Sequence, residues 1–156
     1  MEVYNMLSWE NLKKWDFDVF VLNTITRRRP LMFCAWAILG SPYSQKAMAH
    51  ELGLDSKSED FQGYPFIDDF KISPDKLLDY LRVIELDYHA ANPYHNAIHA
   101  ADVLQTLHTL IQSSLDEEFI VDCGNVKLFT ILLAAVIHDV DHPGTLLSCS
   151  AILFIL

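Results

Sequence analysis

Glycine and basic residues are scarce in this chain. Its 156 residues include five glycines, whereas 51% of the residues are apolar. This composition excludes a disordered chain and fits about one domain with a buried core. The chain has 11 Lys and Arg against 21 Asp and Glu, which gives a formal charge of −10. Because it lacks a basic face that could bind phosphate backbones, nucleic-acid binding is not expected.

The one basic run in the sequence is Arg27-Arg28-Arg29, directly before Pro30. We interpret it as a solvated turn rather than as a binding patch. An acidic protein can nevertheless act on an anionic substrate if bound metal ions supply the local positive charge.

Cysteines are few, and none has the spacing of a structural metal site. Cys34, Cys123 and Cys149 are odd in number, lack C-x-x-C spacing and lie among apolar residues. This predicts buried free thiols in a reducing compartment. The sequence also lacks an apolar run long enough to cross a bilayer, and its first residues do not resemble a signal peptide. We therefore expect a cytoplasmic protein without a membrane partner.

The periodicity of apolar residues predicts an all-α fold. No alternating strand pattern extends beyond a few residues, and there are no repeats. Pro30 before, and Gly40 after, an apolar run mark a short buried helix. Ser73-Pro74 begins an amphipathic helix with a stripe of Leu77, Leu78, Leu81, Ile84 and Tyr88. Further helices are expected from Pro42 toward Gly53, from about Tyr94 to Gln112 and from about Val126 to His138, with a polar loop over 55–63.

The first motif with chemical content is His95-x-x-x-His99, on the helix expected from about Tyr94. Residues four apart lie on one face of a helix, one turn from each other, so the two imidazoles could share a metal ion. Taken alone, the spacing also suits two polar residues packed in a core. His108 lies nine residues after His99, about 180° around the helix, and we interpret it as structural or exposed.

The second motif is the heptad from His138 to Gly144, which follows a nearly uninterrupted apolar stretch over 128–137. A buried helix that ends in His138-Asp139 and continues to His142 is costly without a partner, and a metal ion is the natural partner. A polar helix cap followed by a turn would explain part of the cluster. Imidazole and carboxylate ligands together suit Zn²⁺ or a harder ion such as Mg²⁺ or Mn²⁺, and indicate a hydrolase.

Residues 92–103, Asn-Pro-Tyr-His-Asn-Ala-Ile-His-Ala-Ala-Asp-Val, and the heptad over 138–144 resemble the metal-site signatures of class I cyclic-nucleotide phosphodiesterases. Residues 15–20, Trp-Asp-Phe-Asp-Val-Phe, also resemble the opening of that catalytic domain. The resemblance covers about residues 8–144. Within the family, residues 25–31 most resemble the high-affinity cAMP-specific subfamily with a PAS sensor. The implied fold is the N-terminal part of a multi-helix, HD-type catalytic domain.

The resemblance also implies roles for single residues. It makes His99, His138 and Asp139 metal ligands, with Asp139 between a Zn²⁺ and a second ion, Mg²⁺ or Mn²⁺. Paired ions would activate water for attack on the cyclic phosphate, opening 3′,5′-cyclic AMP to 5′-AMP.

Three other positions match residues around the reacting phosphate. His95 matches the general acid that protonates the leaving 3′-oxygen. His142 matches a histidine near the phosphate, and Tyr94 matches a position that lines the substrate pocket.

The chain departs from the family pattern over 145–156. Leu147 stands where the family has an Asn, and an apolar tail follows in place of the second half of the domain. That half would supply the last Asp ligand, a Glu that orients the general acid, and the residues that grip the purine. We therefore expect 1–156 to be a partial catalytic domain, from a short isoform or an interrupted gene, with impaired or no activity.

Two other functions stay open at this point. One is an inactive short isoform that associates with a full-length homologue. The other is a different HD-type phosphohydrolase that acts on nucleotides. The sequence does not distinguish cAMP from cGMP as the substrate.

Overall fold

The computed structural model describes residues 2–51, 62–114 and 117–144. Every regular element within these ranges is an α-helix, and no strand occurs in them, which confirms the all-α prediction. The helices are α1 (Glu2–Met6), α2 (Trp9–Leu12), α3 (Val19–Ile25), α4 (Pro30–Leu39), α5 (Tyr43–Glu51), α6 (Phe66–Asp69), α7 (Pro74–Leu86), α8 (Ala97–Ser114) and α9 (Glu117–Ile137).

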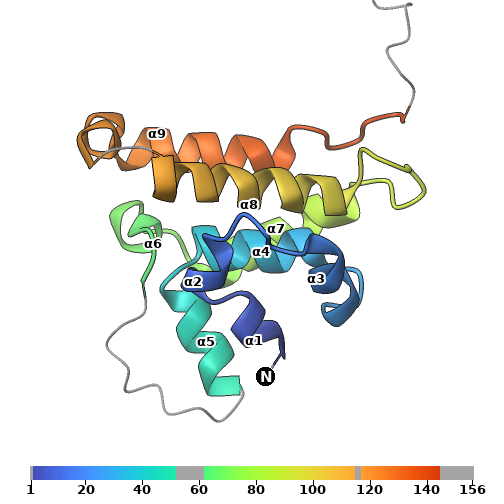
Figure 1. Ribbon diagram of the computed structural model, residues 1–156, viewed down its shortest axis with the longest axis horizontal. Helices are drawn as coiled ribbons and strands as arrows, with labels where there is room; N and C mark the ends of the chain where they lie inside the picture. Colours follow the sequence, from blue (N-terminus) through green and yellow to red (C-terminus); the bar gives the residue numbers. More distant parts are fainter. Residues whose placement is uncertain (1, 52–61, 115–116, 145–156) are drawn as a thin grey trace, which may run out of the picture.

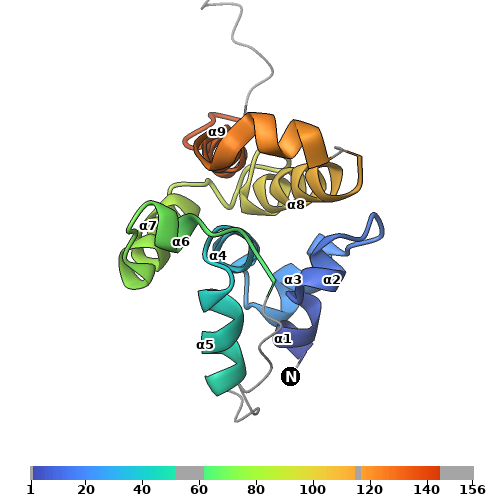
Figure 2. The same ribbon diagram turned by 90° about the vertical axis from the view of Figure 1, so that its left-hand side faces the viewer.

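Helices α8 and α9 lie side by side and run in opposite directions, above a second layer that contains α4 and α7 (Figures 1 and 2). Apolar side chains fill the space between the layers: Leu104, Leu128, Leu132 and Val136 from the upper pair, and Ile38 from α4, are buried. Because the two upper helices are antiparallel, the beginning of α8 and the end of α9 lie at the same end of the molecule. Both sequence motifs are located there.

The two best-marked helices form where the sequence predicts them. Pro30 is the first residue of α4 and Gly40 follows its last, and nine of the ten α4 residues are buried. Ser73 caps α7 by accepting a hydrogen bond from the backbone N–H of Lys76. Helix α7 ends at Leu86, so Tyr88 is buried in the turn that follows and does not belong to the helical stripe.

The predicted start of α8 at about Tyr94 is wrong by three residues. The helix begins at Ala97, and the Asn96 side chain accepts hydrogen bonds from the backbone N–H groups of Ile98 and His99. A short polar side chain that captures backbone donors ends the preceding turn and begins the helix. His95 therefore lies in a turn, outside the helix that carries His99, and the two do not share a helical face.

Helix α9 begins earlier than predicted, at Glu117, but it is broken at Gly124. The glycine has φ +66° and ψ +159°, values that separate a first short segment from the long apolar segment that ends at Ile137. This second segment matches the helix expected from about Val126. The described part of the chain holds no helix of the length and apolar character needed to span a membrane.

Several smaller predictions can be compared with the structure. Arg27 and Arg28 are exposed in a turn with positive φ, as expected of a solvated turn before α4. Cys34 is a buried free thiol. The Cys123 side chain, Cys149, most of the loop over 55–63 and the tail over 145–156 lie outside the described residues.

His108 is structural rather than exposed. Its imidazole is fully buried against Trp9 and Tyr64, and its Nδ1 atom is 3.1 Å from the Tyr64 hydroxyl. Burial lowers the pKa of His108 to about 3, so the ring is neutral.

A buried carboxylate connects α7 to α4. Oε1 of Glu85 accepts hydrogen bonds from the backbone N–H groups of Leu31 and Met32, at 2.9 and 3.1 Å. These donors belong to the first turn of α4 and have no partner within their own helix. Burial raises the pKa of Glu85 to about 7, although the two hydrogen bonds and Arg29 act in the opposite direction.

The raised pKa of Glu85 predicts a pH-dependent stability. Its folded pKa of about 7 exceeds the unfolded value of 4.5, so the folded protein binds more protons between these pH values. The free energy of unfolding should therefore fall as pH rises from about 4.5 to 7, by on the order of 1–3 kcal/mol. Glu85→Gln should flatten this slope in urea denaturation followed by circular dichroism.

Asp79→Asn serves as the matched control, because Asp79 is an exposed carboxylate on the same helix. It should leave the slope unchanged. If Glu85→Gln keeps the wild-type dependence of the unfolding free energy on pH, Glu85 is not the group that causes it.

Candidate metal centre

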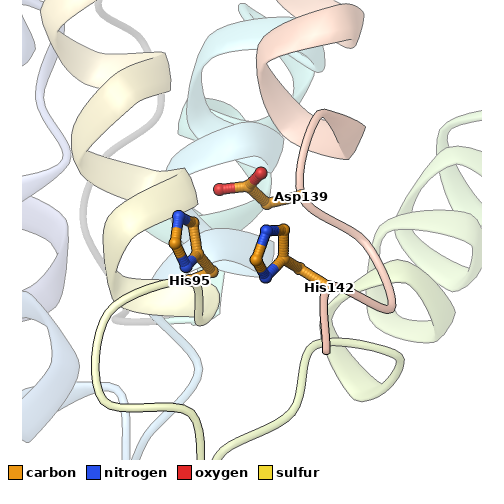
Figure 3. Close-up of side chains that lie close together, drawn as sticks. All are labelled: His95, Asp139 and His142. Atoms are coloured by element: carbon orange, nitrogen blue, oxygen red, sulfur yellow. The ribbon is translucent and has the colours of Figure 1, made fainter. Parts of the chain in front are cut away.

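Five side chains from the two motifs converge at the end of the α8–α9 pair. His95 lies in the turn before α8 and His99 in its first turn, whereas His138, Asp139 and His142 follow the end of α9. The structure thus brings together every predicted His and Asp of the site, although 39 or more residues separate the two groups in the sequence. Figure 3 shows His95 and His142 side by side, with the Asp139 carboxylate beside them.

One half of the site contains His99, His138 and Asp139. Oδ2 of Asp139 is 3.2 Å from Nε2 of His138 and 3.5 Å from Nε2 of His99. One ligand atom from each residue lies within 4.8 Å of the other two. The Asp139 and His99 side chains are 15% and 19% exposed, and His138 is 33% exposed, so the group is partly open to solvent. Two imidazoles and a carboxylate with an open side are a typical donor set for a divalent ion.

The protonation of these imidazoles also suits metal binding. Burial lowers the pKa of His99, the neighbouring His138 lowers it further, and Asp139 opposes both effects. A neutral imidazole has a lone pair for a metal. The Nδ1 atom of His138 lies 2.9 Å from the carbonyl oxygen of Ala135, which can only accept a hydrogen bond. His138 therefore carries its proton on Nδ1, which leaves the Nε2 lone pair facing Asp139.

The other half of the site contains His95 and His142, again with Asp139. The two rings are stacked, with centroids 3.9 Å apart and planes 21° from parallel. The backbone N–H of Gly144 donates to Nδ1 of His142 at 3.0 Å, so the neutral ring carries its proton on Nε2. Although these residues and Asp139 are close enough to hold an ion, this tautomer makes His142 a hydrogen-bond donor rather than a ligand.

Sequence reasoning missed the residues that support the second motif. The Tyr88 hydroxyl donates to the carbonyl oxygen of Val136 at 2.9 Å and accepts from the Asp139 backbone N–H at 3.4 Å. Nε2 of His89 is 2.8 Å from Oδ1 of Asp141. Their signal in the sequence is a Tyr-His pair that two residues separate from Asn92. These contacts fix the backbone that carries Asp139.

Tyr94 lies at the edge of the site. Its side chain is 61% exposed, and its ring centroid is 4.4 Å from that of His99. Tyr94 and His99 help to line a hollow of about 240 Å³, whose other wall includes Val19 and Phe20 from α3. Because Asp139 is absent from that lining, the predicted contact between Tyr94 and the substrate stays a prediction.

Comparison with known proteins places these residues in a family. Residues 94–146 match the sequence profile described as 3′5′-cyclic nucleotide phosphodiesterase, a span that includes all five convergent side chains. The chain is 36% identical over 134 residues to 3′,5′-cyclic-AMP phosphodiesterase 4 of Dictyostelium discoideum, an alignment that covers 86% of this chain and 10% of that protein.

Two mammalian relatives are similarly close. The high affinity cAMP-specific and IBMX-insensitive 3′,5′-cyclic phosphodiesterase 8A of Mus musculus is 34% identical over 139 residues, covering 88% of this chain and 14% of the relative. The 3′,5′-cyclic-AMP phosphodiesterase 4C of Mus musculus is 32% identical over 135 residues, covering 86% and 16%. The identities to the three relatives lie between 32% and 36%, so the predicted subfamily stays a prediction.

The chain thus spans between a tenth and a sixth of the length of these relatives. The similarity extends over most of its residues, and the convergent His and Asp side chains lie within the matched profile. On this evidence, the chain belongs to the 3′,5′-cyclic nucleotide phosphodiesterase family.

Proposed function

We propose that this chain forms the metal-binding part of an active site that hydrolyses 3′,5′-cyclic AMP to 5′-AMP. The observation that carries the proposal is the position of Asp139, whose Oδ2 atom lies between an imidazole nitrogen on α8 and one directly after α9. The choice of cAMP rests on the relatives, which are named as cAMP phosphodiesterases.

The residues of the first half of the site suit a divalent ion such as Zn²⁺. His99 and His138 would each contribute Nε2, and Asp139 a carboxylate oxygen that can also face a second ion, Mg²⁺ or Mn²⁺. When bound, such ions supply positive charge to the phosphate and make a water molecule a better nucleophile at neutral pH. In a chain with a formal charge of −10, this local positive charge is what an anionic substrate requires.

His95 and His142 would handle protons and hydrogen bonds rather than the metal. The ring nitrogens of His95 have no hydrogen-bond partner among the described residues, so the imidazole is free to face a substrate. As the water oxygen bonds to phosphorus and releases a proton to the solvent, the bond from phosphorus to the 3′-oxygen breaks, and the imidazolium form of His95 gives a proton to that oxygen. The Nε2–H group of His142 would donate a hydrogen bond to a phosphate oxygen.

Metal binding by the chain itself provides the first test. Asp139→Ala and His138→Asn each remove a ligand, so we expect Zn²⁺ affinity to fall by about 100-fold or more, beyond the effect of a lost supporting contact. Isothermal titration calorimetry on residues 1–156 measures this change.

Asp79→Ala is the matched control, because Asp79 is an exposed carboxylate on α7 and belongs to neither half of the site. It should bind Zn²⁺ nearly as the wild type does. Equal affinities for the Asp139→Ala and wild-type proteins would refute the metal centre.

The role of His95 provides the second test. In any polypeptide that contains this chain and hydrolyses cAMP, His95→Gln should lower turnover by about 10²–10⁴-fold, because a proton donor is lost. Bound metal, measured by mass spectrometry of the purified protein, should stay at the wild-type level. His50→Gln, an exposed histidine on α5, is the control and should change neither quantity.

The substrate panel in this assay separates the proposed reaction from its alternatives. Turnover of nucleoside triphosphates without turnover of cyclic nucleotides would indicate another HD-type phosphohydrolase. Metal binding without any turnover, together with binding to a longer homologue, would indicate a role in association.

A further inference from the structure

Asn92 connects the two sequence motifs that carry the site, and no catalytic or metal-binding role accounts for it. It lies in the segment between α7 and α8 and is 8% exposed. Its Oδ1 atom accepts hydrogen bonds from the backbone N–H groups of Tyr94 and His95, at 3.3 and 3.2 Å. Its Nδ2 atom donates to the backbone carbonyl of His142 at 3.3 Å, across 50 residues of sequence.

These contacts determine how the Asn92 amide is oriented. Two backbone N–H groups can only donate, so they require the oxygen on their side. The carbonyl of His142 can only accept, so it requires the nitrogen. Turning the amide over would leave all three groups without a partner in a nearly buried place, at a free-energy cost for each. The side chain therefore holds the backbones of His95 and His142 at a fixed separation.

Gly144 makes the contact tighter. A Cβ atom built on this residue would lie 3.0 Å from Nδ2 of Asn92 and 3.2 Å from its Cγ, closer than side chains normally approach. The residue also has φ +74°, a conformation that glycine adopts without strain. The last residue of the second motif thus packs directly on the Asn92 amide, and it donates its N–H to the His142 ring.

A local turn would not need the bond to His142. The two bonds to Tyr94 and His95 are those of an ordinary Asx turn, which forms within a few residues. The bond from Nδ2 instead reaches the second motif. Tyr88 and His89, from the same segment, contact other residues of the second motif region: Val136, Asp139 and Asp141. Among the hydrogen bonds between these two segments, the one to His142 comes from Asn92.

We propose that Asn92 is a positioning residue that sets the stacked geometry of His95 and His142. The assignment rests on the proposed function for its catalytic consequence, because these two imidazoles are the pair that would protonate the leaving oxygen and bind the phosphate. Asn92 touches neither metal ligand side chains nor a substrate position. It acts through the backbone of the two histidines, whose rings are 3.9 Å apart.

Two substitutions divide the contacts of Asn92. Asn92→Asp has the same shape and keeps the acceptor for Tyr94 and His95, but it loses the donor to His142 and places an oxygen against that carbonyl. Asn92→Ala loses both sets of contacts. The control is Ser73→Ala, which removes the cap of α7 and leaves the 88–92 segment intact.

The first readout does not depend on catalysis. In NMR spectra of residues 1–156, the stacked imidazoles of the wild type should give ring-to-ring nuclear Overhauser effects and upfield-shifted ring protons. We expect both signatures to be lost in Asn92→Asp and Asn92→Ala and kept in Ser73→Ala. The amides of Tyr94 and His95 should keep their protection from hydrogen exchange in Asn92→Asp and lose it in Asn92→Ala.

The second readout is turnover by a cAMP-hydrolysing polypeptide that contains this chain. Asn92→Asp should lower kcat by about 10-fold and Asn92→Ala by about 100-fold, the range seen when a supporting contact of an active-site group is lost. Zn²⁺ affinity should stay within about 3-fold of wild type, because His99, His138 and Asp139 are held by other contacts.

The outcomes separate the two proposals. If the protein does not hydrolyse cAMP but the NMR signatures respond as expected, the proposed function fails and the positioning role stands. If Asn92→Asp keeps the stacked rings, the positioning role is overturned whatever the activity. If Ser73→Ala also loses the NMR signatures, the effect of the Asn92 substitutions is a general loss of stability, and the positioning role is overturned.

Discussion

The antiparallel packing of α8 against α9 is the interaction on which the candidate site depends. Ala100, Ala101 and Leu104 on one helix and Leu132 and Val136 on the other are buried, so the pair is held by apolar contacts along its length. Burial of this kind is worth roughly 25 cal/mol per Å². It places two polar motifs at one end of an apolar helix pair. Burying imidazoles and a carboxylate at this end costs free energy of desolvation. The fold tolerates this cost because the apolar packing of the two helices, rather than the polar groups, supplies the stability.

The sequence predicts what depends on local patterns. Pro30 and Gly40 delimit α4, and Ser73 caps α7, because these residues act on the backbone within a few positions of themselves. The convergence of His95, His99 and the heptad was also predicted, through the resemblance to a known family. Their distances and tautomers were not, since these depend on Ala135, Gly144 and the course of the backbone after α9.

Side-chain hydrogen bonds that the apolar periodicity does not encode explain the errors in the predicted helix bounds. Asn92 and Asn96 both capture backbone donors, so the chain turns twice before α8 and His95 stays outside the helix. A helical pattern counted from Tyr94 cannot show this competition. The same periodicity predicts Tyr88 in the α7 stripe for a different reason, because its hydrogen-bond partners, Val136 and Asp139, are 48 and 51 residues away. Glu85, likewise, has its partners 53 and 54 residues away.

The contacts of the segment between α7 and α8 restrict the insertion or deletion of residues in it. Exposed connections usually accept inserted residues, because few contacts depend on their exact path. Ala90 and Ala91 are exposed and look suited to insertion. Their neighbours Tyr88, His89 and Asn92, however, each bind a different point of the 136–142 segment. One added residue here would preserve every helix and every candidate ligand, yet it would break the register between the two motifs. Length variation should therefore be selected against in this loop and accommodated elsewhere on the surface.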